Sequence, residues 1–164
     1  MPSTGTAEVT LPTPTQILIT REFDAPARLI YEAYTTPELV KRWWSGRRGE
    51  VTSAEIDLRV GGSWRYVMTA SGGHEVAFHG TYSELVPGER IVSTEVFEGA
   101  PVPDPDALAT LNTVTLSEEG ETTLFTCLVE APNREVRDVI IDSGMEGGMQ
   151  EGMDLLEELA HSLA

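Results

Sequence analysis

The fold is decided by a stretch near the carboxyl end, SGMEGGMQEGMDLLEEL at residues 143–159. It lies in the longest helical pattern of the chain, which opens at Asn133, a good helix cap, and runs to Ala164. The four glycines of this stretch each cost a helix interior about 1 kcal/mol relative to alanine, so the helix needs tertiary support. We therefore expect the rest of the chain to wrap a curved sheet around it, with room for a ligand between them. The apolar residues that share one face of the pattern are Ile141, Met145, Met149, Leu156, Leu159, Ala160 and Leu163.

The composition of the chain excludes some classes of binding partner. The chain has 164 residues, 40% of them hydrophobic, and carries a formal net charge of -16 with a pI near 4.4. This charge opposes binding to nucleic acid and to anionic membrane surfaces, so we expect neither as a partner. The single cysteine, Cys127, excludes an intrachain disulfide. Residues 1–14 do not resemble a signal peptide and no apolar run is long enough to span a bilayer, so we expect a cytoplasmic protein.

The order of the predicted elements indicates an α+β fold. The small, polar and proline-containing residues 1–14 predict a disordered tail, and residues 15–164 predict a single domain. Two short helices should follow the first strand, and the long helix should cover one face of an antiparallel sheet. Hydrophobic alternation and turn residues predict seven strands: 16–23, 51–58, 63–70, 75–86, 90–97, 111–117 and 122–129.

Several details of the helices and turns can also be predicted. Asp24 is a candidate cap for the first helix, which Pro26 should open. Residues 98–109 contain three prolines and predict a loop with one helical turn at 106–109. The final helix should kink near Gly144, because Val139 and Ile140 lie off its apolar face.

No recognised catalytic or cofactor motif is present. The glycine pairs lack the spacing of a phosphate loop or a dinucleotide fingerprint, and the three histidines lack metal-ligand spacing, so we expect no cofactor and no metal. The weak candidates for acid–base chemistry are His79, Glu84 and Asp142. Other polar side chains near the predicted pocket are Arg65, Thr94, Glu95, Asn112 and Thr113. A one-residue error in strand register would turn any of the strand residues from the inner to the outer face.

Methionines and aromatic residues gather where a pocket is expected. The methionines recur every four residues on the final helix, which fits either core packing or an adaptable cavity wall. The aromatic residues of the second helix and the middle strands likewise fit either a core or a largely apolar ligand site. The predicted ligand-binding residues are Trp44, Trp64, Tyr66, Phe78, Tyr82, Thr94, Cys127, Met145, Met149 and Met153.

Four motifs in this order resemble one known superfamily. They are PARLIYEAYTTPELVKRWW at 26–44, DLRVGGSW at 57–64, GTYSELVPGERIV at 80–92 and the glycine–methionine stretch at 143–159. Together they resemble the SRPBCC or START-like superfamily, and more narrowly the bacterial homologues of the activator of the heat-shock-protein-90 ATPase. The resemblance covers residues 15–163. It implies the helix-grip fold of the birch pollen allergen, in which a curved antiparallel sheet grips a long C-terminal helix around a cavity.

Three functions are compatible with this resemblance, because a fold does not fix a function. The first is binding of a small hydrophobic ligand in the cavity, for transport, sequestration or sensing. The second is an enzyme of the polyketide cyclase or aromatase type. The third is a co-chaperone-like module that binds a protein partner, with an implied link to the stress response. The oligomeric state, including a homodimer, stays open.

Overall fold

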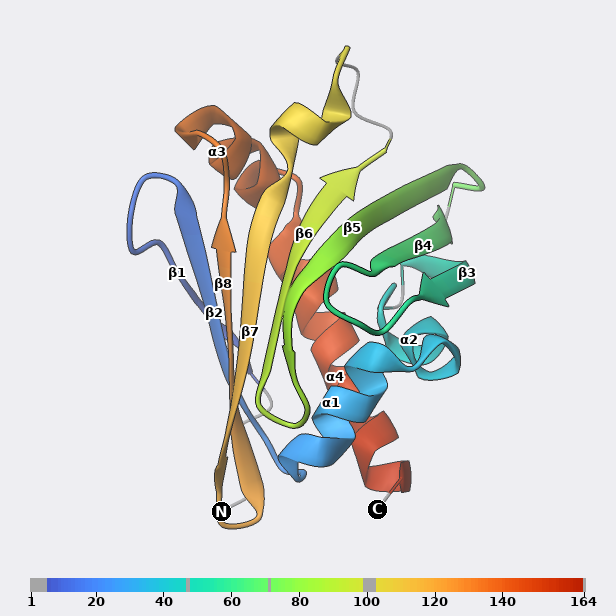
Figure 1. Cartoon of the computed structure of the whole chain (residues 1–164), viewed down its shortest axis with the longest axis vertical. Helices are drawn as coiled ribbons and strands as arrows, with labels where there is room; N and C mark the ends of the chain where they lie inside the picture. Colours follow the sequence, from blue (N-terminus) through green and yellow to red (C-terminus); the bar gives the residue numbers. More distant parts are fainter. Residues whose placement is uncertain (1–5, 47, 71, 99–102, 164) are drawn as a thin grey trace.

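The described residues fold into one eight-stranded antiparallel sheet and four α-helices, and Figure 1 shows their arrangement. The computed structural model describes residues 6–46, 48–70, 72–98 and 103–163. The strand order is β1-β2-β8-β7-β6-β5-β4-β3, and the sheet bends around α4. The elements are β1 (Glu8–Thr10), β2 (Gln16–Phe23), α1 (Ala27–Thr35), α2 (Pro37–Trp43), β3 (Gly49–Ile56), β4 (Ser63–Ala70), β5 (Glu75–Val86), β6 (Arg90–Phe97), the 3-10 turn η1 (Pro105–Leu108), β7 (Thr110–Glu119), β8 (Thr122–Glu130), α3 (Arg134–Asp142) and α4 (Met145–Leu163).

The predicted α+β architecture is confirmed, with one strand more than the seven expected. The extra strand, β1, pairs with the edge of β2 inside the segment for which disorder was predicted. Its approach to the core depends on Ala7, which is buried and bonded at both backbone groups to the side-chain amide of Gln150 on α4. Ala7 N donates to Oε1 at 3.0 Å, and Nε2 donates to the Ala7 oxygen at 2.7 Å. These long-range bonds could not be inferred from local composition; residues 1–5 lie outside the described residues.

The carboxyl-terminal helical pattern is divided at Gly144. This residue has φ of +82°, a left-handed conformation that favours glycine, and it separates α3 from α4. The interruption predicted near Gly144 is therefore a full break between two helices. As predicted, Asn133 caps α3, since its side chain accepts a hydrogen bond from Val136 N at 2.9 Å. Among the described residues, no helix is long and apolar enough to cross a membrane.

Helix α1 starts without help from its predicted cap, Asp24. Pro26 occupies the cap position and makes no side-chain capping bond. Instead the amide of Ala27 donates to a carboxylate oxygen of Glu118 at 2.8 Å, reaching across from β7. The first turn of the helix is thus satisfied by a distant strand, which a local sequence pattern does not reveal.

Strand β2 forms one wall of the core. Its alternation buries Ile17, Ile19, Arg21 and Phe23 on one face. Arg21 is the unusual member, because its side chain is only 1% exposed. Its guanidinium lies 4.9 Å from the Phe23 ring centroid, a cation–π arrangement.

Arg21 anchors the second half of α4 to the sheet. Its Nη1 donates to Asp154 at 2.9 Å and its Nη2 to Glu157 at 3.4 Å. Glu157 also accepts a bond from the Asp24 amide at 2.8 Å, so one carboxylate joins α4 to the end of β2. A buried cation thus fixes the position of the helix along the strand, at the cost of desolvating a guanidinium.

Two β-bulges curve the opposite half of the sheet. The register shifts between Val51 and Ser53 on β3 and between Tyr82 and Glu84 on β5. Such bulges bend and twist a strand. Gly80 lies just before the second bulge, and a Cβ there would meet the backbone oxygen of Thr94.

The glycines of α4 make room for the segment around the end of α2. A Cβ on Gly152 would lie 3.1 Å from the backbone oxygen of Trp43, whereas one on Gly148 would meet only the flexible side chain of Arg48, at 3.6 Å. Close approach of a neighbouring element is therefore seen at Gly152. The approaching element is a helix end rather than a strand.

We expect Arg21→Leu to lower the free energy of unfolding by about 3 kcal/mol, because the two α4 carboxylates then lose their buried cation. Urea unfolding followed by circular dichroism measures the loss. Arg59→Leu is the matched control, since Arg59 pairs with Asp57 at 2.8 Å on the surface and its side chain is 71% exposed. Its effect should stay within about 0.5 kcal/mol. Equal losses in the two variants would contradict the anchoring role.

Two of the three glycines of α4, Gly152 and Gly148, should respond to substitution in opposite directions. Gly152→Leu should cost about 2 kcal/mol by forcing α4 away from the end of α2. Gly148→Ala should raise the free energy of unfolding by up to about 1 kcal/mol through better helix propensity. The same unfolding experiment compares them, and a neutral Gly152→Leu would show that the close approach is not needed.

Candidate functional site

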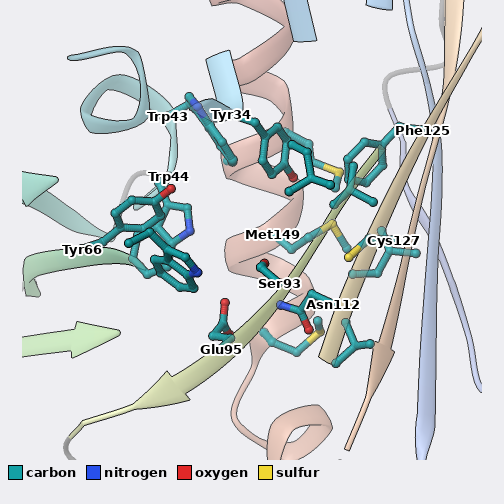
Figure 2. Close-up of a pocket in the computed structure, with 18 of the residues that line it drawn as sticks. Tyr34, Trp43, Trp44, Tyr66, Ser93, Glu95, Asn112, Phe125, Cys127 and Met149 are labelled. Carbon is teal, nitrogen blue, oxygen red and sulfur yellow. The ribbon is translucent and has the colours of Figure 1, made fainter. Parts of the chain in front are cut away.

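A cavity of about 320 Å³ lies between the curved sheet and the first half of α4 (Figure 2). Its walls come from α1, α2, the middle strands and α4. Most of the lining is apolar, as is typical of small-molecule sites. The lining residues are Ile19, Tyr34, Trp43, Trp44, Trp64, Tyr66, Tyr82, Ile91, Ser93, Glu95, Asn112, Val114, Phe125, Cys127, Val129, Met145, Gly148, Met149, Gly152 and Met153.

One wall is a group of packed aromatic rings. The Tyr66 ring lies 4.7 Å from Trp64 and 5.3 Å from Trp44, measured between ring centroids. Trp64 is held in place because its Nε1 donates to the backbone oxygen of Thr94 at 3.2 Å, over the space that Gly80 leaves without a side chain. All three rings, those of Trp44, Trp64 and Tyr66, line the cavity, so this wall is aromatic.

The facing wall is formed by α4. Met145, Met149 and Met153 line the cavity together with Gly148 and Gly152. Methionine side chains adapt to irregular shapes, and glycine leaves space beside them. Met153 is buried, while Met145 and Met149 are only partly buried and pack against the core. The methionine series thus belongs both to the core and to the cavity wall.

A short polar strip interrupts the apolar lining. Ser93 and Glu95 are two residues apart on β6 and so share its inner face, and Asn112 on β7 pairs directly with Ser93. Figure 2 shows the three side chains together at one side of the cavity, with the Glu95 carboxylate directed into it. Within the described part of the chain, no side chain donates a hydrogen bond to that carboxylate and no cation pairs with it.

Burial shifts the protonation of the groups around the cavity. It raises the pKa of Glu95 from 4.5 to about 7 and the pKa of Cys127 to about 12, the latter with a further contribution from the nearby Glu95 charge. Burial also raises the pKa of Tyr34 and of Tyr66 well above 10.0. Near neutral pH, Glu95 is thus the lining group that exchanges its proton most readily.

Eight of the ten predicted binding residues line the cavity; the exceptions are Phe78 and Thr94. Phe78 packs behind the wall, with its ring 5.1 Å from Trp44 and 5.2 Å from Phe97. Thr94 alternates with the inward-facing Ser93 and Glu95, and its hydroxyl accepts a bond from the Thr81 amide at 3.0 Å. The placement of the other eight is a geometric finding, and their binding of a ligand remains a prediction.

The three weak catalytic candidates lie outside the cavity. His79 is on the outer face of β5, where its Nδ1 contacts Glu98 at 2.8 Å. Glu84 follows the bulge in β5 and pairs with Arg90 at 2.9 Å. Asp142 is exposed at the end of α3, because the break at Gly144 ends the helix on which its inward direction was projected.

Glu98 organises the outer cluster that contains His79. Arg65 donates two hydrogen bonds to its carboxylate, each 2.9 Å long. These bonds, with the contact from His79, lower the pKa of Glu98 to about 2. The cluster is an ion-pair group of the outer sheet surface and takes no part in the cavity.

The polar strip was the part least visible in the sequence. Glu95 and Asn112 were only two of several polar candidates, and Ser93 was not singled out. The alternation of Ile91, Ser93 and Glu95 along β6 carries the signal, but it becomes usable only once the strand register is known. Among the described residues, no group of three His, Cys, Asp or Glu side chains is placed to hold a metal ion.

The fold and cavity define a class of α+β proteins in which a bent antiparallel sheet encloses a ligand-sized space against a C-terminal helix. The chain belongs to the family described as Activator of Hsp90 ATPase homolog 1-like protein, whose model matches residues 24–161. This fold is compatible in general with a ligand-binding or a co-chaperone-like role. No curated protein sequence matches the chain.

Solved structures of several bacterial proteins share the fold. A Rhodobacter sphaeroides protein superposes with a TM-score of 0.85 at 22% identity, covering 95% of this chain and 99% of its own. A Nitrosomonas europaea protein gives 0.82 at 22% identity, covering 93% and 98%. A Chromobacterium violaceum protein is 28% identical with a TM-score of 0.75, covering 90% and 98%.

The raised pKa of Glu95 should make folding stability depend on pH. Between the unfolded value of 4.5 and the folded value of about 7, the native state holds a proton that the unfolded state has lost. The native state is therefore destabilised as pH rises, by about 1.4 kcal/mol per pH unit and on the order of 3 kcal/mol in all.

Glu95→Gln removes this titration, so its free energy of unfolding relative to the wild type should rise across that window and level off above about pH 7. Urea unfolding at a series of pH values measures the difference. Glu84→Gln is the control, because Glu84 lies on the outer face of the neighbouring strand. A difference between Glu95→Gln and wild type that is constant with pH would contradict a raised native pKa.

Proposed function

We propose that this protein binds a small, largely apolar molecule in the cavity between the sheet and α4, in order to carry, sequester or sense it. The observation that supports the proposal is a preformed space of about 320 Å³ with a mainly apolar lining. A core that only stabilised the fold would close such a space, because interiors pack to high density and voids are costly.

The size of the cavity suits a ligand of one or two fused rings. Burying about 250 Å² of apolar ligand surface yields about 6 kcal/mol at 25 cal/mol per Å². Without the costs of association, this corresponds to a dissociation constant of roughly 30 micromolar, and those costs weaken the binding of a ligand held by apolar contact alone to the millimolar range or beyond. Tighter binding requires the polar strip to contribute.

An enzyme is the second candidate, and Glu95 is the observation that favours it. A carboxylate inside an apolar cavity, with a pKa of about 7, has the properties of a general base. Ser93 and Asn112 lie beside it and could orient a carbonyl or hydroxyl group. Such an enzyme would transfer a proton to or from a bound substrate, as a cyclase does. This reaction requires that the same cavity admits the substrate.

Binding can be tested with N-phenyl-naphthylamine, an uncharged probe whose fluorescence rises in apolar surroundings. We expect saturable binding to the wild type, and at least a tenfold loss of affinity in Met149→Trp, because the indole fills the space beside Gly148. Native mass spectrometry of the protein from its own host then identifies what occupies the cavity.

Val139→Trp is the matched control, since Val139 is 68% exposed on α3 and adds the same ring away from the cavity. It should bind the probe like the wild type. Equal binding by all three proteins would place the probe outside the cavity, and an absence of binding to the wild type would count against the proposed function.

A further inference from the structure

The Glu95 carboxylate is an acid without a counter-charge inside an apolar cavity. No Lys, Arg or His is present among the described residues that line the space. The carboxylate points into the cavity (Figure 2), and no described side chain satisfies it by a hydrogen bond or an ion pair. A buried charge in such surroundings is costly unless a partner compensates it.

The aromatic wall of the cavity is also suited to a cation. Trp44, Trp64 and Tyr66 present their rings to the same space as the Glu95 carboxylate. Electron-rich ring faces attract cations, most strongly when water is excluded. A carboxylate and several rings around one cavity form a combination that stabilises a positive charge from two directions.

The charge of the whole chain acts in the same direction. With a net charge of -16, the protein attracts cations to its surface and repels anions. A fatty acid or another anionic ligand would bring a second negative charge next to Glu95 with no cation on the lining to offset it. The electrostatics therefore disfavour acidic ligands and favour basic ones.

We propose that the cavity selects an apolar amine, whose protonated nitrogen pairs with the Glu95 carboxylate while its hydrocarbon part lies between the aromatic wall and Met149. This inference rests on the proposed function and specifies the ligand class for the same cavity. Ser93 and Asn112 lie beside the carboxylate and offer acceptors for the remaining N–H groups of the ammonium.

The raised pKa of the Glu95 carboxyl in the empty protein is consistent with a cationic ligand. Burial alone raises the pKa of Glu95 in the empty protein to about 7, so a bound cation would restore the charged form. The other titratable groups on the cavity lining are Tyr34, Tyr66, Tyr82 and Cys127, all with pKa values raised by burial, and none of them changes charge near neutrality. The lining residues of α4 and β7 include no titratable side chain.

The test compares three probes of nearly one shape: naphthylmethylamine, naphthylmethanol and naphthoic acid. Isothermal titration calorimetry on the full chain measures each dissociation constant at about pH 8, where Glu95 is ionised. The amine should bind at least tenfold more tightly than the alcohol, and the acid should bind more weakly than the alcohol. The amine remains protonated between about pH 5 and pH 8, so its affinity should fall about tenfold per pH unit below about pH 7, until it meets that of the alcohol.

Two variants separate the carboxylate from general effects of charge. Glu95→Gln should abolish the preference for the amine and its pH dependence, while changing the affinity for the alcohol by less than about twofold. Glu84→Gln removes the same single charge from the outer face and should retain the preference.

The outcomes distinguish this inference from the proposed function. If the alcohol binds and Met149→Trp blocks it, but the amine gains no preference, the cavity is a ligand site and the amine class is wrong. The amine class is also wrong if Glu95→Gln keeps the preference or if the acid binds most tightly. If none of the probes binds to the wild type, the amine inference and the proposed binding function are both contradicted.

Discussion

The ion pairing of Arg21 with Asp154 and Glu157 is the constraint on which the rest of the structure depends. It fixes the second half of α4 against β2, where Leu156 and Ala160 are fully buried. The first half of the same helix is held differently, by the close approach of Gly152 to the end of α2. The space beside Met149 is bordered by the part of α4 that lies between the break at Gly144 and these two anchors.

The core and the cavity use the same side chains in different roles. Along α4, Met153 is buried in the core while Met149 faces the open space. Along β6, Ile91 belongs to the core cluster and the next inward positions are polar. The change from tightly packed core to cavity lining thus takes place within one turn of α4 or two residues of β6. This gradation explains why core packing and cavity wall were equally good interpretations of the methionine and aromatic patterns.

The sequence allowed the fold to be predicted because the deciding signals are local. Four of the strands begin and end at the predicted residues, and Asn133 caps its helix as expected. The failures involve partners that are distant along the chain: Gln150 holds Ala7, the residue before β1, and Glu118 accepts the hydrogen bond from the first turn of α1. The residues of the candidate site show the same difference between local and distant signals. Helical spacing placed Met145, Met149 and Met153 on one face, whereas the strand register needed to distinguish Glu95 from His79 or Glu84 is set by pairing and bulges.

The amide of Gln150 contacts Ala7 as a neighbouring strand would, bonding both its N–H and its carbonyl. Gln150 is the residue next to Met149, so the amino-terminal segment is mechanically joined to the helix turn that borders the cavity. The segment that contains Ala7 therefore braces this turn of α4. A change that disturbs Ala7 thus acts on the helical wall of the cavity, although Ala7 itself does not line it.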